Sequence, residues 1–120
     1  MKYMIMTFGE AATMKETKSS DWIREMIQFM HALNDDLRDS GELVDAQGLV
    51  DGTHAKTVRF ENGAPIATDG PFAESKESLV GYWVVDVEGE RRAIEIASRI
   101  VAFVEAPIEV RRIADGPPEV

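Results

Sequence analysis

Residues 61–86 read ENGAPIATDGPFAESKESLVGYWVVD and contain a tight turn, a rigid loop and an apolar strand in close succession. Asn62-Gly63 is the strongest short-range signal for a β-hairpin, so we predict strands over about 55–61 and 65–68 on its two sides. Residues 79–86 alternate between two faces that are both apolar, which predicts a strand buried on both sides. The stretch therefore indicates an antiparallel sheet.

The loop between these strands, DGPFAESK at 69–76, has an unusually restricted backbone. Proline fixes its own φ and restricts the residue before it, so Pro71 makes the loop stiff. Gly70 can adopt conformations that a residue with a Cβ cannot. We therefore expect Asp69 to sit at a rigid, shaped corner.

The rest of the chain supplies two more strands and two helices. Residues 2–8 and 108–113 have the short apolar pattern of strands. Apolar residues at helical spacing predict helices from about 20 to 39 and from about 90 to 104. We predict an α+β domain with a ferredoxin-like, mainly antiparallel sheet and two helices on one face, spanning residues 1–120 as a single domain.

Two helices can cover one face of such a sheet but not both. The strands at 2–8 and 79–86 are nevertheless apolar on both sides. A second copy of the sheet, packed about 10 Å away and related by a two-fold axis, would cover the other face. We predict a homodimer through the sheet face; the alternative is a monomer in which residues 9–19 and 46–53 fold over the sheet.

Composition excludes several classes of protein. The chain has 120 residues, no cysteine and a net charge of -9, so thiol catalysis and thiolate metal sites are excluded and phosphate backbones would be repelled. We expect no direct nucleic-acid binding, no membrane segment, no metal and no cofactor. A cytoplasmic location is expected because a chain without cysteine suits a reducing compartment.

The first predicted helix carries a polar seam formed by His31, Asn34 and Arg38. Helical geometry puts Asn34 inside the apolar stripe, where an amide must find hydrogen-bond partners. His31 lies at the border of that stripe and is the residue best suited to proton transfer near neutral pH. The alternatives are that Asn34 caps a neighbouring backbone and that His31 serves only packing or the surface.

Asp69 is the acidic partner that we consider for His31. If the rigid loop held its carboxylate against the helix, Asp69 would orient His31 and raise its pKa, and the two would act as a general acid or base. The alternative is that Asp69 bonds backbone amides within its own turn.

Further candidates for ligand binding lie in the loop and in the strand that follows it. Gly70 and Pro71 shape the loop, and Lys76 could bind an anion or a substrate. We expect Phe72 to plug into the core. The remaining candidates, Tyr82 and Trp83, could line an apolar pocket whose polar end is formed by Asn34, His31 and Asp69.

The chain resembles the YCII-related superfamily, specifically its branch with a D-G-P-F-A-E-[ST]-K-E loop. The similarity also covers MKYMIM at 1–6, NDDLR at 34–38, residues 41–49 and IEVR at 108–111. The resemblance implies a ferredoxin-like domain that dimerises through its sheet into a dimeric α+β barrel, with a cleft proposed as an active site. Some relatives are reported or proposed to use a His–Asp pair, with the His one residue out of step with His31. Many relatives are encoded beside extracytoplasmic-function sigma factors.

These observations leave three functions open. We favour a homodimer that binds a small molecule in a cleft. The second is a small enzyme of the lyase, isomerase or hydrolase type, in which His31 and Asp69 transfer protons. The third is a non-catalytic partner in regulation linked to sigma factors, as the resemblance implies.

Overall fold

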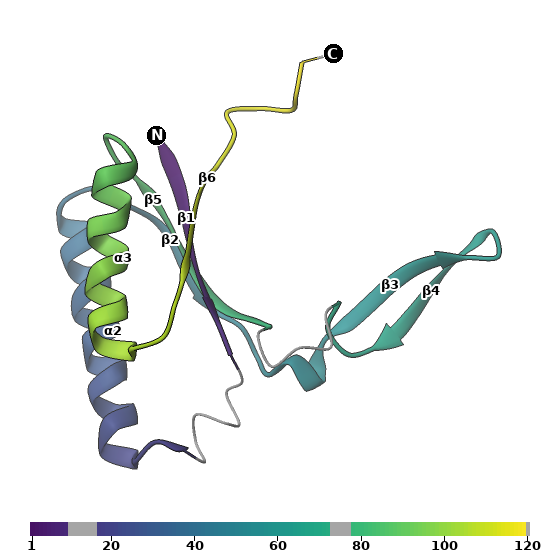
Figure 1. Cartoon of the computed structure of the whole chain (residues 1–120), viewed down its shortest axis with the longest axis horizontal. Coiled ribbons are helices and arrows are strands. Elements are labelled where there is room, and N and C mark those ends of the chain that lie inside the picture. Colours follow the sequence, from purple (N-terminus) through teal and green to yellow (C-terminus); the bar gives the residue numbers. More distant parts are fainter. Residues whose placement is uncertain (10–16, 73–77, 120) are drawn as a thin grey trace.

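The computed structural model describes residues 1–9, 17–72 and 78–119. Within these residues the chain forms a four-stranded sheet, two α-helices and a separate hairpin (Figure 1). In chain order the elements are β1 (Lys2–Phe8), α2 (Ser20–Asp39), β2 (Leu43–Gly48), the 3₁₀ turn η1 (Gly52–His54), β3 (Lys56–Glu61), β4 (Ala64–Asp69), β5 (Leu79–Asp86), α3 (Glu90–Val104) and β6 (Glu109–Arg112).

The four-stranded sheet has the order β2-β5-β1-β6, and every neighbouring pair of strands is antiparallel. Both helices lie on the same side of it (Figure 1). This is the ferredoxin-like arrangement, with the hairpin inserted between β2 and β5. The predicted α+β fold is confirmed, and the two helices have the bounds that the sequence indicated.

The sheet differs from the sequence prediction at one edge. β2 was not predicted as a strand, yet it pairs with β5. The hairpin of β3 and β4 was predicted correctly but placed in the main sheet, whereas it forms a sheet of its own. Its turn is made by Asn62 and Gly63, whose φ angles of 50° and 78° are those that a two-residue hairpin turn requires.

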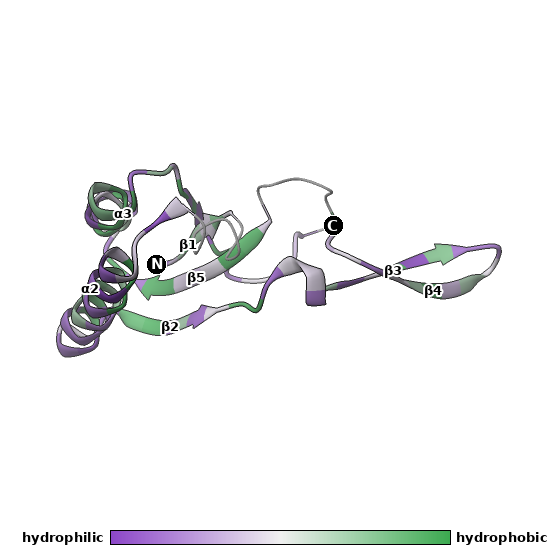
Figure 2. Ribbon diagram, turned by 90° about the horizontal axis from the view of Figure 1, so that it is seen from below, coloured by the Kyte–Doolittle hydropathy of each residue, from purple (hydrophilic) through white to green (hydrophobic). Residues whose placement is uncertain are grey.

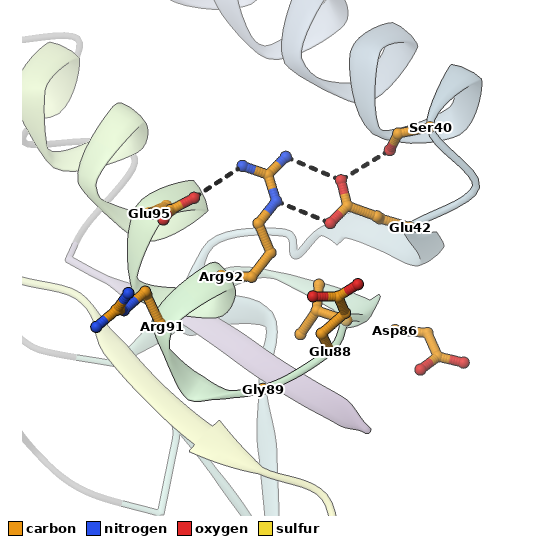
Figure 3. Close-up of a pocket in the computed structure, with 9 residues that line it drawn as sticks. Ser40, Glu42, Asp86, Glu88, Gly89, Arg91, Arg92 and Glu95 are labelled. Carbon is orange, nitrogen blue, oxygen red and sulfur yellow. Dashed lines mark hydrogen bonds and ion pairs between the residues drawn. The ribbon is translucent and has the colours of Figure 1, made fainter.

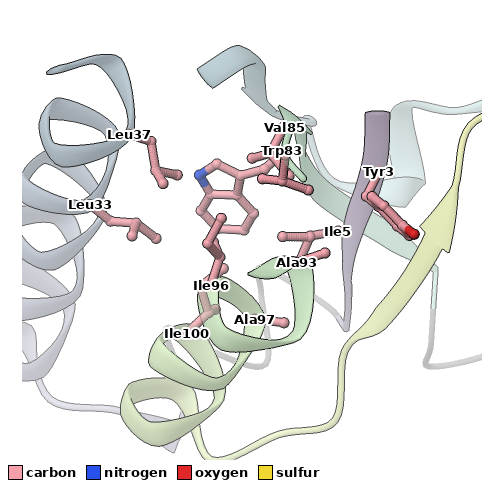
Figure 4. Close-up of a cluster of buried hydrophobic side chains, with 11 residues drawn as sticks. Tyr3, Ile5, Leu33, Leu37, Trp83, Val85, Ala93, Ile96, Ala97 and Ile100 are labelled. Atoms are coloured by element: carbon pink, nitrogen blue, oxygen red, sulfur yellow. The ribbon is translucent and has the colours of Figure 1, made fainter. Parts of the chain in front are cut away.

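The hydrophobic core lies between the sheet and the two helices. Figure 4 shows the indole of Trp83 between α2 and α3, close to Leu33 and Ile96. The buried side chains of this core are Tyr3, Ile5, Leu33, Leu37, Trp83, Val85, Val87, Ala93, Ile96, Ala97 and Ile100. Since β1 and β5 contribute only alternate residues, their other residues face away from the helices.

The face of the sheet turned away from the helices, called the open face below, carries two rows of side chains that cross all four strands. The strand register places Asp45, Val84, Met4 and Arg111 in one row, and Gln47, Tyr82, Met6 and Glu109 in the next. Each row is apolar or aromatic at its centre and polar at both edges. No helix in the described part of the chain covers this face (Figure 1).

The hairpin of β3 and β4, called the arm below, projects from the sheet on the side opposite to the helices (Figures 1 and 2). The radius of gyration is 16.6 Å, whereas a compact domain of this length would have about 14 Å. Thr57 is the one buried side chain of the arm. The arm is therefore an extension of the domain and adds little to its core.

An ion pair fastens α3 to the start of β2 (Figure 3). Arg92 donates from Nε and Nη2 to the two carboxylate oxygens of Glu42 at 2.8 and 2.9 Å. These hydrogen bonds hold the pKa of Glu42 below its ordinary value, against the opposing effect of burial, and the hydrogen bond from Ser40 acts in the same direction as Arg92. The pair joins α3 to β2 at one end of the helix layer. The cavity described below lies at the other end.

Candidate ligand-binding cavity

A cavity of about 680 Å³ lies between α2 and the sheet, at the end where β1 and β2 finish. The strand register explains the space. Thr7, Gly81 and Gly48 form the row of the sheet that faces the helices here, and all three are small. Cavities of roughly 300–1,000 Å³ are the size that small-molecule ligands occupy.

One stripe of α2 forms the opposite wall. Trp22, Met26, Met30 and Asn34 recur every four residues and all line the cavity. The helix begins with a side-chain cap, in which Ser19 Oγ accepts a hydrogen bond from the backbone N–H of Trp22 at 3.1 Å. The wall is thus apolar along most of its length and ends in an amide.

Asn34 supplies a fixed polar group within this apolar wall. Trp83 Nε1 donates to Asn34 Oδ1 at 2.7 Å, so the indole is the hydrogen-bond partner that the position of Asn34 required. With its oxygen engaged, the amide can present Nδ2 to a ligand as a donor. The site therefore suits an acceptor atom on an otherwise apolar molecule.

Trp22 and Lys18, which both line the cavity, bring an aromatic ring and a positive charge together. Trp22 packs against Phe103 with ring centroids 5.5 Å apart, and Phe29 stacks on the same ring at 4.9 Å. Lys18 Nζ lies 5.0 Å from the centroid of the Trp22 ring, within the range of a cation–π contact. Among the described lining residues, Lys18 is the one with a charged side chain.

Two residues of the predicted seam lie outside the cavity lining. His31 and Arg38 are exposed on α2, and Arg38 pairs with Asp35 at 3.0 Å. Of the seam, the structure brings only Asn34 to the cavity.

Within one chain the structure does not bring Asp69 and His31 together. Asp69 is exposed at the end of β4 and forms an ion pair with Lys56 on the neighbouring strand. α2 and the arm lie on opposite sides of the sheet in both Figure 1 and Figure 2. The acid–base pair is therefore not formed within one chain.

Gly70, Pro71 and Phe72 of the loop also lie outside the cavity lining. Gly70 has a φ of 102°, and its carbonyl accepts from Thr57 Oγ1 at 2.8 Å, so it closes the base of the arm beside Pro71. The prediction that Phe72 plugs into the core is wrong, because 82% of its surface is exposed and it lies beneath Arg59, 6.0 Å from the guanidinium. Lys76 is outside the described residues.

Tyr82 and Trp83 are both among the residues that line the cavity, although the side chain of Tyr82 belongs to a row of the open face and that of Trp83 faces the helices. The hydroxyl of Tyr82 donates to Asp45 Oδ2 at 3.1 Å. This hydrogen bond, together with burial and the negative charge of Asp45, raises the pKa of Tyr82.

The sequence did not identify Trp22, Met26, Met30 or Lys18 as residues that line a cavity. The signal available for Trp22 was its place four residues before Met26 on the same helical stripe.

In the ranges 1–9, 17–72 and 78–119, no group of three or more potential metal ligands lies together. None of the described helices combines the length and apolar character needed to cross a membrane.

The fold and the cavity define a ferredoxin-like α+β domain with an internal space between its helices and its sheet. Residues 1–116 match the YCII-related domain, and the chain belongs to this family. The chain is also 30% identical to an uncharacterised protein of Rhizobium meliloti (strain 1021). The alignment extends over 101 residues and covers 81% of this chain and 77% of that protein.

Proposed function

We propose that the protein is a homodimer that binds a small, largely apolar molecule in the cavity between α2 and the sheet. The observation that carries this proposal is the cavity itself, with about 680 Å³ of space, two tryptophans in its wall and the amide of Asn34 at its polar end. The ligand has an acceptor atom for Asn34, and Lys18 at the mouth favours a negative group.

The described part of the lining supports binding rather than proton transfer. It contains no aspartate, glutamate or histidine, which are the usual general acids and bases. His31 and Asp69 are both exposed, and Asp69 is paired with Lys56. The arrangement therefore favours a binding protein over an enzyme that uses these two residues.

The open face supports the homodimer. Its centre is apolar and aromatic, and its edges carry charges of both signs, with Asp45 beside Gln47 on β2 and Glu109 beside Arg111 on β6. A two-fold axis parallel to the strands sets the β2 edge of each copy against the β6 edge of the other. Asp45 then faces the partner's Arg111, and the apolar centres pack on each other.

Binding can be tested with 1-anilinonaphthalene-8-sulfonate, an anionic aromatic probe that fluoresces in apolar sites. Met26→Glu places a negative charge in the cavity, which repels the anionic probe, whereas Ile27→Glu places the same side chain on the exposed side of the same helix. We expect Met26→Glu to weaken probe binding at least tenfold and Ile27→Glu to change it less than twofold. Thermal melts identify any loss that comes from unfolding.

Equal probe affinity in wild type and in folded Met26→Glu would overturn the assignment of the cavity. A Lys18→Ala variant separately tests the positive charge at the mouth. It should weaken the anionic probe but leave neutral 1-anilinonaphthalene unaffected, because only the anion gains from a cation at the mouth.

A further inference from the structure

We propose that the arm of each copy crosses to the partner copy and covers the mouth of the partner's cavity. This inference rests on the proposed homodimer but not on the identity of a ligand. It makes each binding site a composite of two chains.

The arm has an apolar face that its own chain leaves uncovered. Val58 and Phe60 are 68% and 75% exposed, and the register sets them opposite Ala67 and Pro65 on β4. A two-stranded hairpin with no packing partner is only marginally stable in water. The apolar face therefore indicates a surface that packs against another chain.

The position of the arm indicates that the chain packed against it is a second copy of the same protein. The arm and the open face lie on the same side of the sheet, opposite to the helices (Figures 1 and 2). Any copy that docks on the open face comes to lie alongside the arm. Two-fold symmetry then places the second arm against the first copy in the same way.

Interface size supports a contribution from the arm. A face of four strands about 4.8 Å apart and roughly seven residues long measures about 450 Å². Stable interfaces bury about 800 Å² on each partner. The open face alone falls short of this size, and the arm supplies further apolar surface on the same side.

The arm is also long enough and leaves the sheet at the right end. Six residues of strand span about 20 Å, whereas packed sheets are about 10 Å apart, so the arm extends past the partner's sheet to its helix layer. The base of the arm lies at the end of the sheet where the cavity opens. Gly52, just before the arm, is so close to Ser78, just before β5, that a Cβ added at Gly52 would lie 3.3 Å from Ser78 Oγ. With the two-fold axis parallel to the strands, these ends of the two copies coincide.

The mouth of the cavity offers a matching apolar surface. Phe8 and Leu49 line the cavity and are 37% and 45% exposed. Contact with the partner's Val58 and Phe60 would remove both apolar patches from water, which is the favourable term in association. We therefore assign Phe8 and Leu49 as the docking surface of the arm.

Disulfide cross-linking tests the inference, since the chain has no cysteine of its own. A Val58→Cys chain is mixed with a Leu49→Cys chain that carries a size tag, and the rate of heterodimer formation is followed under mild oxidation. The matched control replaces Val58→Cys by Arg59→Cys, which lies on the opposite face of the same strand. We expect the Val58 pair to cross-link at least tenfold faster, and Phe60→Ser in the Val58→Cys chain to remove that advantage.

Sedimentation of the unoxidised proteins separates the possible failures. Equal rates for the Val58 and Arg59 pairs in a protein that sediments as a dimer overturn the position of the arm and leave the homodimer standing. A monomer at all concentrations overturns both. A Val58→Cys/Leu49→Cys double variant that closes its disulfide within one chain would likewise show that the arm covers its own cavity.

Discussion

Asn34 links the core to the cavity through one hydrogen bond. Because Trp83 Nε1 is largely removed from water, Asn34→Leu leaves that donor without an acceptor. We expect the free energy of unfolding to fall by about 1–3 kcal/mol, measured by urea denaturation. Gln28→Leu, at an exposed position of the same helix, should change it by less than about 0.5 kcal/mol. A loss in Asn34→Leu no larger than in this control would contradict the role of the bond.

The helical period was enough to predict that Asn34 faces the core and needs a partner. It was not enough to name Trp83, 49 positions away, because that contact depends on how β5 packs against α2. The same limit explains His31 and Asp69. Residue type makes both suitable for proton transfer, but their separation is set by the arm, which leaves the main sheet before Asp69 is reached.

Tyr82 provides a pH-dependent signal on the open face. Its raised pKa means that the folded state favours the neutral phenol, so the stabilisation is present below the ordinary tyrosine pKa and is lost as pH rises through the folded one. Asp45→Asn should lower the pKa of Tyr82, as followed by absorbance at 295 nm. Tyr3→Phe isolates the signal because the chain has only two tyrosines. Asp39→Asn serves as the control, and an equal shift in that variant would remove Asp45 as the cause.

Among the elements, those with one unbroken pattern could be predicted and β2 could not. The helices keep their apolar period throughout, and the hairpin has Asn62-Gly63 at its turn. In β2 the register shifts between Leu43 and Asp45, so the alternation of inward and outward residues is interrupted. A strand of six residues with a bulge lacks the period that reveals strands in a sequence.

The ion pair between β2 and α3 predicts a second pH dependence. Glu42→Gln should lower the free energy of unfolding by about 1–2 kcal/mol at pH 7, because two charge-assisted hydrogen bonds to Arg92 are weakened at a partly exposed site. The lowered pKa of Glu42 means that this stabilisation is present above the ordinary carboxyl pKa and is lost as pH falls through the folded one. Urea denaturation of wild type and variant should therefore converge as the pH falls from the ordinary glutamate pKa through the lower pKa of the folded state.

Glu95→Gln is the matched control for this pair. Glu95 accepts one hydrogen bond from the same Arg92 at 3.2 Å and is more exposed than Glu42. We expect a loss of less than about 0.5 kcal/mol. If the free energy of unfolding falls equally in the two variants, the two hydrogen bonds from Arg92 to Glu42 stabilise the fold no more than the single one to Glu95.

At the scale of the whole molecule, the open face and the arm both carry apolar surface that the described part of the chain leaves exposed. β1 and β5 are apolar on both sides although the helices cover only one, which is the feature of the sequence that predicted a second copy. The arm adds an apolar face that the sequence could not place, because a hairpin looks the same inside a sheet and outside it. Its position relative to the sheet could not be predicted, because the sequence at 49–55 and 70–78 has no periodic pattern.

The association itself can be tested on the open face. Val84→Arg puts a charge at the centre of the open face, in the row that also contains Met4. In the proposed dimer this centre has apolar side chains on both copies. Since burying an unpaired charge is strongly unfavourable, we expect the variant to sediment as a monomer at concentrations where the wild type is a dimer. Ile94→Arg, at an exposed apolar position on α3, is the control and should leave the dimer intact. A dimer that persists in folded Val84→Arg would exclude the open face as the interface and remove the basis for a cavity shared between two chains. A dimer lost only in Ile94→Arg would place the interface on the helix side of the molecule.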